Sequence, residues 1–285
     1  MYDELSWSEN RSMTDKPAML CLSNRKGGVG KTTCSIHTAG ALAARGRDVL
    51  LFDLDPQGTI TRGLGYTGYY EDMERDVTLH EVLLERDSID RISEIIEEHP
   101  EFDIARSHKR MTFDTASKLS GEPRAEDRLE LAVAELDRLY DYIIVDCPPS
   151  LDILTDNALL ATGNVLIPTY PEELSVQGLD LLFDQVDELE EWHDTEIRKL
   201  GLIANRIETN NEADEYLALF EENFSALWDM WQIRKRVVLQ RAITQGHGSI
   251  FTHDEGCDMV AEFESIARTL DETFDLPAAD SGVVA

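Results

Sequence analysis

The sequence predicts an α/β protein with one doubly wound, mostly parallel sheet flanked by helices. From Ala18 onward, short apolar runs alternate with segments whose apolar residues recur at helical spacing. A glycine-rich loop separates the first run from the first helical segment, and two later runs end in aspartates. Repeated strand–helix units of this size form a parallel sheet whose sites lie at the carboxyl ends of the strands. A length of 285 residues favours a single domain.

The individual elements follow from these patterns in chain order. DVLLFDL at 48–54 is apolar enough for a buried strand, and apolar residues between 129 and 139 recur at helical spacing. Strands are expected at 19–23, 48–54, 103–105, 142–145, 165–167 and 201–204, and helices at 32–45, 66–100, 126–139, 176–189 and 257–274. They would form a domain at 18–276, between a flexible tail at 1–17 and a disordered tail at 277–285.

The composition is strongly acidic. Aspartate and glutamate number 57 against 26 lysines and arginines, which gives a formal net charge of −31. Salt screens such self-repulsion, with a Debye length of about 3 Å at 1 M, so the surface indicates a halophilic protein from a high-salt cytoplasm. An acidic face for a basic partner would need a localised block of acids, whereas here they are spread over nearly every segment.

Cysteine usage and hydropathy argue against several classes of protein. The four cysteines lie far apart and form no CxxC pair, which fits small buried core residues better than a disulfide framework or a zinc site. No run of about 18 apolar residues is available to span a membrane. The N-terminus lacks the charged-then-apolar layout of a signal peptide. We therefore expect a cytoplasmic protein.

Residues 26–33, KGGVGKTT, predict a phosphate-binding loop. Phosphate recognition needs converging backbone N–H groups with a helix N-terminus behind them, and the glycines give the freedom for that turn. Lys31 would reach the β and γ phosphates, and the Thr32 hydroxyl would bind Mg²⁺. Because the stretch follows a predicted strand and opens a predicted helix, it indicates a P-loop protein that uses ATP and Mg²⁺.

Two predicted strands end in carboxylates that would complete this site. Asp146 follows the apolar run 142–145 in a Walker B arrangement, which holds Mg²⁺ through water. Asp53 and Asp55 end the other strand and face the same edge of the sheet, so we expect Asp53 to join Thr32 and Asp146 at the metal. A loop-capping role for one of the two aspartates is the alternative.

Further blocks give the glycine-rich motif a family resemblance. Lys26 stands at the position of the signature lysine of the deviant Walker A family, which includes ParA/Soj and MinD. The match continues through LLFDLDPQG (50–58), YDYIIVDCPPSL (140–151), NVLIPTYPEELSVQGL (164–179) and GLIANRI (201–207). In their order and spacing, these blocks resemble ParA/Soj partition ATPases in particular.

The resemblance implies a homodimer that forms on ATP binding. In this family the signature lysine, here Lys26, reaches the phosphates bound by the opposite subunit, and the second DxD aspartate, here Asp55, orients or activates the attacking water. Asn205 matches the family's adenine-contacting asparagine, with a strand-end cap as the alternative. A ParB-like DNA-binding partner would stimulate hydrolysis. The residues implied are Lys26, Lys31 and Asp55 for catalysis, and Lys26, Gly27, Gly28, Val29, Gly30, Lys31, Thr32, Thr33 and Asn205 for nucleotide binding.

One basic cluster interrupts the acidic C-terminal part of the chain. After residue 207, four of the five basic residues fall within residues 234–241: Arg234, Lys235, Arg236 and Arg241. We interpret them as a surface for sequence-independent DNA binding, at the place where the family carries such residues. The family's usual proline and second arginine are absent here. Internal salt bridges to nearby acids are the alternative.

These features predict a nucleoid-associated ATPase of plasmid or chromosome partition. A cargo- or site-positioning ATPase of the same family that does not act on DNA is the alternative. Membrane positioning would need a basic amphipathic C-terminal helix, whereas this chain ends in the acidic LDETFDLPAADSGVVA, so no membrane partner is expected. An iron–sulfur function would need paired cysteines. With about 17 residues before the first strand, an N-terminal helix-turn-helix is not expected.

Overall fold

Eight strands of the described chain form one sheet, in the order β3-β4-β2-β5-β1-β6-β7-β8. The computed structural model describes residues 16–208, 211–226 and 228–276. Neighbouring strands are parallel except for the antiparallel pair β3 and β4. The strands are β1 (Ala18–Leu22), β2 (Val49–Asp53), β3 (Ile96–Glu97), β4 (Asp103–Ala105), β5 (Tyr142–Asp146), β6 (Asn164–Thr169), β7 (Arg198–Ile207) and β8 (Asp229–Arg234). The predicted doubly wound, mostly parallel sheet is confirmed.

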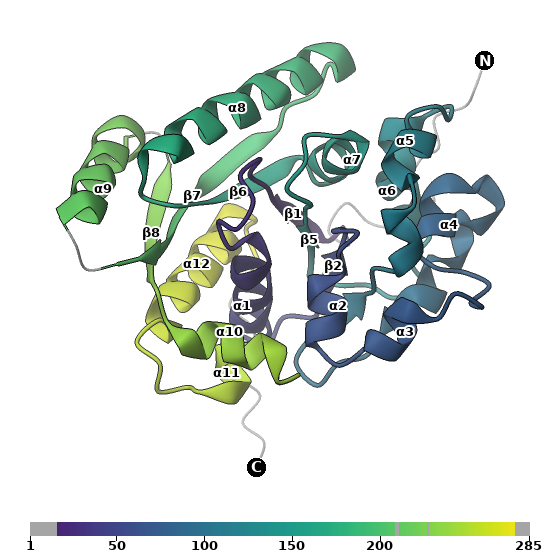
Figure 1. Cartoon of the computed structure of the whole chain (residues 1–285), viewed down its shortest axis with the longest axis horizontal. Helices are drawn as coiled ribbons and strands as arrows, with labels where there is room; N and C mark the ends of the chain where they lie inside the picture. The colour runs from purple at the N-terminus through teal and green to yellow at the C-terminus, as the bar shows by residue number, and fades with distance from the viewer. Residues whose placement is uncertain (1–15, 209–210, 227, 277–285) are drawn as a thin grey trace.

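Helices cover both faces of this sheet (Figure 1). One layer consists of α1 (Lys31–Ala44), α10 (Val237–Thr244), α11 (Ile250–His253) and α12 (Val260–Thr273), and the other of α4 (Leu79–Leu84), α6 (Arg128–Ala134), α7 (Ile153–Thr162) and α8 (Glu173–His193). Successive side chains of a strand point to opposite faces, so Ile144 of β5 packs with the α1 layer, and Ile143 and Val145 with the α7 layer. Strands β2 and β5 are consequently buried at every position.

The remaining helices, most of them short, lie around the edges of these layers. They are α2 (Thr59–Gly63), α3 (Thr67–Glu71), η2 (Arg86–Ile95), η3 (Lys109–Thr112), α5 (Thr115–Leu119), η4 (Ala125–Asp127) and α9 (Asn211–Phe224). Helix α9 packs on α8 through Phe183 and Phe224, whose ring centroids are 6.5 Å apart. Within the described part of the chain, no helix is both long and apolar enough to cross a membrane.

The segment 66–100 differs from the continuous helical region that was predicted. It forms α3, α4 and the 3₁₀ helix η2, and then enters β3. A capping box starts α4 anew, because the hydroxyl and backbone N–H of Thr78 both bond to Glu81, and an extended backbone at Glu85 ends it. The helix predicted at 126–139 also stops early, after which Leu136 and Tyr140 enter the core from a turn.

Strand β8 was not predicted, because it lies at the edge of the sheet. Its residues alternate between the core and solvent, and Asp229 and Gln232 interrupt any apolar run. The tail predicted at 277–285 lies outside the described residues, as do all but the last two residues of the tail predicted at 1–17.

Candidate active site

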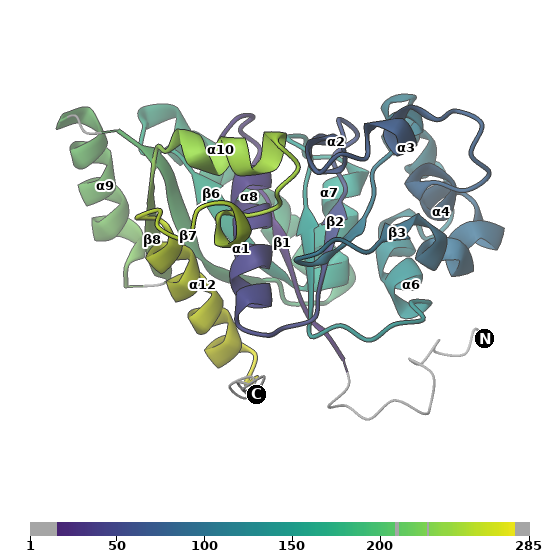
Figure 2. The same cartoon turned by 90° about the horizontal axis from the view of Figure 1, so that it is seen from below.

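The predicted site residues meet at the carboxyl edge of the sheet, where β1, β2 and β5 end. Leu22 pairs with Asp146 across β1 and β5, and Asp53 pairs with Asp146 across β2 and β5. The glycine-rich loop therefore leaves β1 beside both aspartates. Figure 2 shows this loop, α2 and α10 along the same edge. The predicted nucleotide-binding residues lie in this loop and the first turn of α1, apart from Asn205 on β7.

The glycine-rich loop has the backbone that a phosphate cradle requires. Gly28 and Gly30 have φ angles of 79° and 89°, in the left-handed region that suits glycine. Helix α1 begins at Lys31, so its N-terminal N–H groups adjoin the loop. The buried Lys31 amine donates to the backbone oxygen of Asn24 at 2.9 Å. Burial lowers the pKa of this amine, and the nearby carboxylate of Asp146 opposes that shift.

Asp146 is held by two hydroxyl groups of α1. The Thr32 hydroxyl donates to Oδ2 at 2.8 Å, and the Ser35 hydroxyl lies 2.8 Å from Oδ1. Burial raises the pKa of Asp146 to about 7, although these two hydrogen bonds lower it. Ser35 is missing from the predicted site, yet its position one turn after Thr32 places both hydroxyls on one face of the helix.

Asp53 is fully buried beside Asp146. Its Oδ2 accepts the backbone N–H of Thr61 at 2.8 Å and the Thr61 hydroxyl at 2.6 Å, whereas its Oδ1 has no hydrogen-bond partner. Burial raises the pKa of Asp53 to about 8, and Asp146 adds to the shift. Such carboxylates fit Mg²⁺, which binds one or two of them together with phosphate oxygens and water. No preformed cluster of three His, Cys, Asp or Glu side chains exists among the described residues.

Asp55 lies in the turn after β2 and is partly buried. Its Oδ1 accepts the Gln57 backbone N–H at 2.8 Å, so this aspartate does cap its own loop. Burial raises the pKa of Asp55, while the cations of Lys31 and Arg62 partly oppose the shift. The carboxylate therefore stands within electrostatic reach of the phosphate loop.

Lys26 is directed toward the segment that follows β6. Its amine bonds to the carboxylate of Glu172, and its backbone N–H donates to Oδ1 of Asn24 at 3.0 Å. The hydroxyl of Tyr170, in the same segment, donates to the backbone oxygen of Gly28. The sequence predicted neither Tyr170 nor Glu172 as a site residue, although both lie within the matched block 164–179.

Asn205 is buried and braces the glycine-rich loop. Its Nδ2 donates to the backbone oxygen of Val29 at 2.8 Å, and its Oδ1 accepts the backbone N–H of Arg206 at 2.8 Å. A Cβ atom at Gly30 would lie 2.0 Å from that Nδ2, so the two residues are in close contact. Because β7 continues to Ile207, Asn205 lies within the strand and not at its end. Its adenine contact stays a prediction.

Known proteins are similar to this chain in sequence over most of its length. Residues 18–199 match the family model described as an AAA domain. The chromosome-partitioning ATPase Soj of Treponema pallidum is 32% identical over 249 residues, which cover 87% of this chain and 94% of the relative. The sporulation initiation inhibitor protein Soj of Bacillus subtilis is 34% identical over 191 residues, which cover 67% and 73%. The chain belongs to the ParA/Soj family of P-loop ATPases.

Solved structures share the fold of this ParA/Soj-type ATPase. A Borrelia burgdorferi B31 protein assigned to plasmid partition, solved with AMPPNP bound, is 26% identical with a TM-score of 0.72, and the match covers 90% of this chain and 100% of that one. A variant of Cyanothece McdA in complex with ATP has a TM-score of 0.76 at 19% identity, over 93% and 99% of the two chains, which shows a common fold. The predicted family and ATPase activity are confirmed.

Three of the four residues in the basic cluster of this ParA/Soj-type ATPase are paired with carboxylates. Arg236 donates to both oxygens of Asp258, at 2.8 and 2.5 Å, and Arg234 lies 3.6 Å from the same side chain. Lys235 lies 2.6 Å from Glu208. The fourth member of the cluster is exposed on α10. The alternative to DNA binding was that these residues form salt bridges with nearby acids, and such salt bridges are present. DNA contact stays a prediction.

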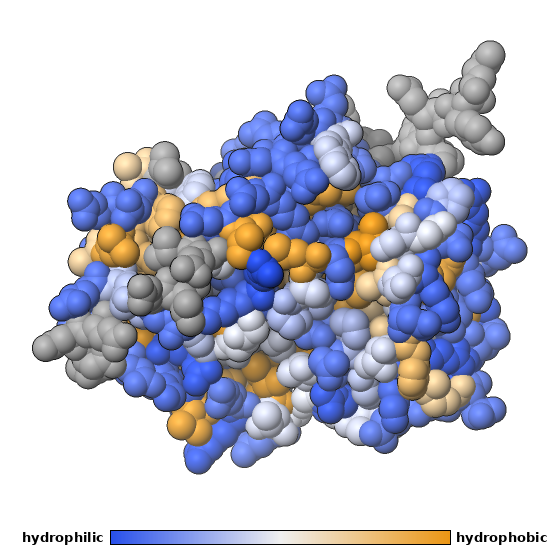
Figure 3. Space-filling view, turned by 45° about the horizontal axis from the view of Figure 1, so that its top comes forward, coloured by the Kyte–Doolittle hydropathy of each residue, from blue (hydrophilic) through white to orange (hydrophobic). Residues whose placement is uncertain are grey.

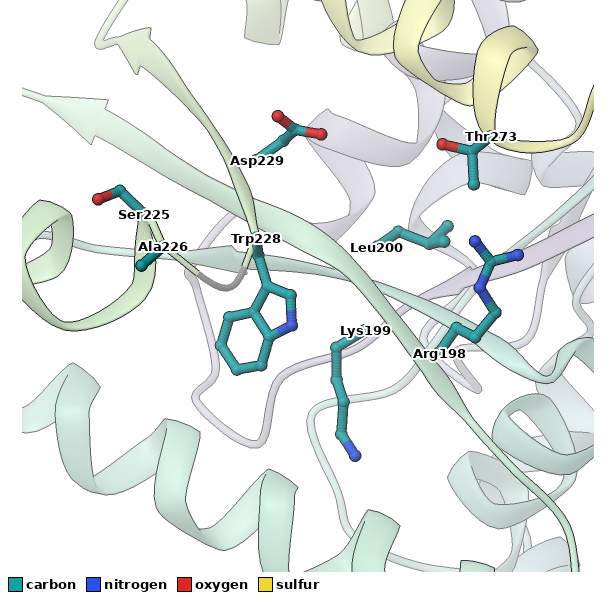
Figure 4. Close-up of a pocket in the computed structure, with 8 residues that line it drawn as sticks. All are labelled: Arg198, Lys199, Leu200, Ser225, Ala226, Trp228, Asp229 and Thr273. Atoms are coloured by element: carbon teal, nitrogen blue, oxygen red, sulfur yellow. The ribbon is translucent and has the colours of Figure 1, made fainter.

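A hollow of about 360 Å³ lies away from the phosphate loop of this ATPase, where β7 and β8 begin. Figure 4 shows Arg198, Lys199 and Trp228 around it, together with Thr273 from α12. Because parallel strands place their amino ends at the opposite edge from their carboxyl ends, this hollow is separate from the nucleotide site. Lys199 is itself paired with Asp187 and Glu190.

Proposed function

We propose that this ATPase is a partition protein, which forms an ATP-bound homodimer, binds DNA without sequence preference and moves a plasmid or chromosome in the cytoplasm. A ParB-like adaptor would stimulate hydrolysis of ATP to ADP and phosphate. The orientation of Lys26 carries the proposal. Lys31 turns its amine into its own phosphate loop, whereas Lys26 in the same loop turns its amine outward to Glu172. That placement suits a lysine that serves the phosphates of a second copy.

Within each copy, the residues at the carboxyl edge would position ATP for attack by water. Thr32, Asp53 and Asp146 would hold Mg²⁺, directly or through water, and the bound ion would neutralise phosphate charge. Lys31, together with Lys26 from the second copy, would stabilise charge that develops on the γ-phosphoryl group. Asp55 would orient the water whose oxygen bonds to phosphorus as the bond to the ADP oxygen breaks.

Light scattering with and without Mg-ATP tests the switch. We expect wild type to be a monomer without nucleotide and a dimer with it. Asp55→Ala should trap the dimer because hydrolysis no longer dissolves it, and Lys26→Ala should bind nucleotide as a monomer. Lys118→Ala, a change at an exposed position on α5, is the control and should behave as wild type. A Lys26→Ala dimer identical to that of wild type would overturn the proposal.

The ion pairs of the basic cluster favour a second candidate, a cargo- or site-positioning ATPase that does not act on DNA. Glu208 and Asp258 neutralise part of the charge that DNA phosphates would contact. The net charge of −31 also repels DNA at low salt. Fluorescence anisotropy with unrelated DNA duplexes separates the two candidates. ATP-dependent binding to every duplex supports partition, and dimerisation without any binding supports the second candidate.

A further inference from the structure

We infer that Thr61 and Ser107 are positioning residues of the ATPase, which set the orientation of Asp53 and hold the backbone at Asp55. The inference rests on the proposed function, because it uses the roles proposed there for the two aspartates. Thr61 belongs to α2, and Ser107 follows β4. Both side chains are fully buried, and both contact the segment that joins the two aspartates.

With Asp53 ionised, the state that binds a cation, the hydrogen bonds of Thr61 can run in one direction only. The Ser107 backbone N–H lies 2.9 Å from the Thr61 hydroxyl oxygen, and an N–H group can only donate. The single hydroxyl proton of Thr61 is therefore left for Oδ2 of Asp53 at 2.6 Å. The backbone N–H of Thr61 donates to the same oxygen at 2.8 Å. Because Oδ2 accepts both donors, Oδ1 is the oxygen that remains for a cation beside Asp146.

Ser107 also holds the second aspartate through its main chain. Its hydroxyl donates to the backbone oxygen of Asp55 at 2.7 Å. Strand β4 places Ser107 there, since Ala105 pairs with Phe52 immediately before Asp53. One buried serine thus fixes both ends of the segment 53–55, at one end through Thr61 and at the other directly.

This arrangement matters because catalytic geometry tolerates little rotation. A carboxylate that binds a metal ion has to be held within about 0.5 Å and 10–20° of its working position. Burial alone leaves the carboxylate of Asp53 able to turn about its last bond, whereas two donors on one oxygen define that angle. Thr61 and Ser107 act through the aspartates and need not touch the nucleotide.

Binding of a fluorescent ATP analogue in Mg²⁺ and in EDTA tests Thr61. Thr61→Val removes the hydroxyl and keeps the backbone N–H. Adding Mg²⁺ should raise the affinity for the analogue, and we expect this increase to be about tenfold smaller in Thr61→Val. Such a change corresponds to the free energy of one hydrogen bond to a charged group. Affinity in EDTA should stay unchanged, and Thr61→Ser should restore the gain. Thr162→Val removes a buried hydroxyl at the end of α7, so it is the matched control and should keep the wild-type gain.

Steady-state kinetics test Ser107. Ser107→Ala should lower kcat several-fold with KM for ATP nearly unchanged, because the backbone anchor of Asp55 is lost while the phosphate loop is intact. Circular dichroism of each nucleotide-free variant separates lost positioning from lost folding.

Two outcomes would overturn the inference, and only the second would also overturn the proposed function. A wild-type Mg²⁺ gain in Thr61→Val, beside a lost gain in Asp53→Asn, would overturn it and leave the proposed function standing. An undiminished gain in Asp53→Asn would overturn the proposed metal site and this inference together.

Discussion

At the scale of single residues, Asp53 and Asp146 are the most unusual feature of the molecule. Two buried carboxylates stand side by side at the ends of neighbouring strands, and hydroxyls and backbone N–H groups are their donors. Charge in such surroundings is costly unless a cation or enough donors compensate it. Both groups therefore hold a proton more tightly than they would in water, because burial disfavours the charged form.

These shifts predict how the stability of the nucleotide-free protein depends on pH. Burial raises the pKa of Asp53 to about 8, whereas an unfolded aspartate titrates near 3.9. Between these values the folded state binds the proton and the unfolded state does not. The contribution of Asp53 to the free energy of unfolding is therefore complete below about pH 4 and lost as pH rises through about 8.

Urea unfolding in EDTA at about pH 5 and about pH 8, at constant ionic strength, measures this loss. The free energy of unfolding should fall by a few kcal/mol between the two conditions in wild type, and by clearly less in Asp53→Asn. Asp184→Asn changes an exposed aspartate of α8 and should keep the wild-type difference. An equal loss in Asp53→Asn and wild type would contradict the assignment.

At the scale of elements, α1 connects the phosphate loop to α10, the helix that carries Arg241 of the basic cluster and follows its other three residues. His37 lies buried within α1, with Nε2 3.1 Å from the backbone oxygen of Leu239 in α10 and Nδ1 accepting the Ile250 N–H of α11 at 3.2 Å. Burial lowers the pKa of His37 to about 3, so the ring stays neutral and both bonds persist at physiological pH. The ring therefore joins α1 to both α10 and α11.

The contact between the phosphate loop and the segment after β6 leads to a prediction about dimerisation. Lys26 has to leave Glu172 before it can reach a second copy. Glu172→Gln removes the negative charge that holds the Lys26 amine. The ATP concentration for half-maximal dimerisation should therefore fall about two- to fivefold, the size expected for the loss of a partly exposed ion pair. Glu188→Gln, an exposed change on α8, is the control. A wild-type midpoint in Glu172→Gln, measured by light scattering, would show that the ion pair does not oppose dimerisation.

The basic cluster gives a second prediction at this scale. The double variant Arg234→Glu with Arg236→Glu should lose binding to unrelated DNA duplexes while it retains ATP-driven dimerisation, because phosphate contacts supply this affinity. Arg198→Glu with Arg268→Glu gives the same net charge with changes at exposed positions outside the cluster. Fluorescence anisotropy at one salt concentration compares the DNA affinity of the two double variants with that of wild type. If the first double variant binds DNA as wild type does, the cluster is an ion-pair network and the contact surface lies elsewhere.

At the scale of the whole molecule, acidity dominates the surface. Figure 3 shows hydrophilic residues over most of one face, with apolar patches between them. The 26 lysines and arginines cannot compensate 57 aspartates and glutamates, so repulsion remains after every ion pair has formed. Two copies joined by ATP would double that charge, yet they would also double the basic cluster, and linked sites gain affinity without new contacts.

This charge predicts a protein that is stabilised by salt. The melting temperature should rise as KCl increases from roughly 0.1 to 3 M, because screening removes self-repulsion. Differential scanning fluorimetry without nucleotide measures the effect, and sucrose at matched water activity controls for general exclusion of solutes. A melting temperature that stays flat or falls with KCl would count against a high-salt origin.

Local patterns were enough to predict the inner strands of the sheet and the edge at which the candidate site residues gather. Apolar runs ending in Asp53 and Asp146 define buried parallel strands, and the glycine-rich loop between a strand and α1 defines a phosphate site. The same patterns failed in 66–100, where capping at Thr78 divides an acidic stretch into short helices, and at β8, where an edge strand has no apolar run.

The sequence by itself determined the family, the phosphate loop and the mostly parallel character of the sheet, since each is indicated by residues that are neighbours along the chain. Tertiary structure alone decided which side chains hold those parts in place. Lys26 meets Glu172 across 146 positions, and Thr61 meets Ser107 across 46. Likewise, ion pairing of the basic cluster depends on carboxylates that lie 22 and 27 positions away. Such partners leave no local periodicity, because the sheet brings together the ends of strands that are distant in sequence.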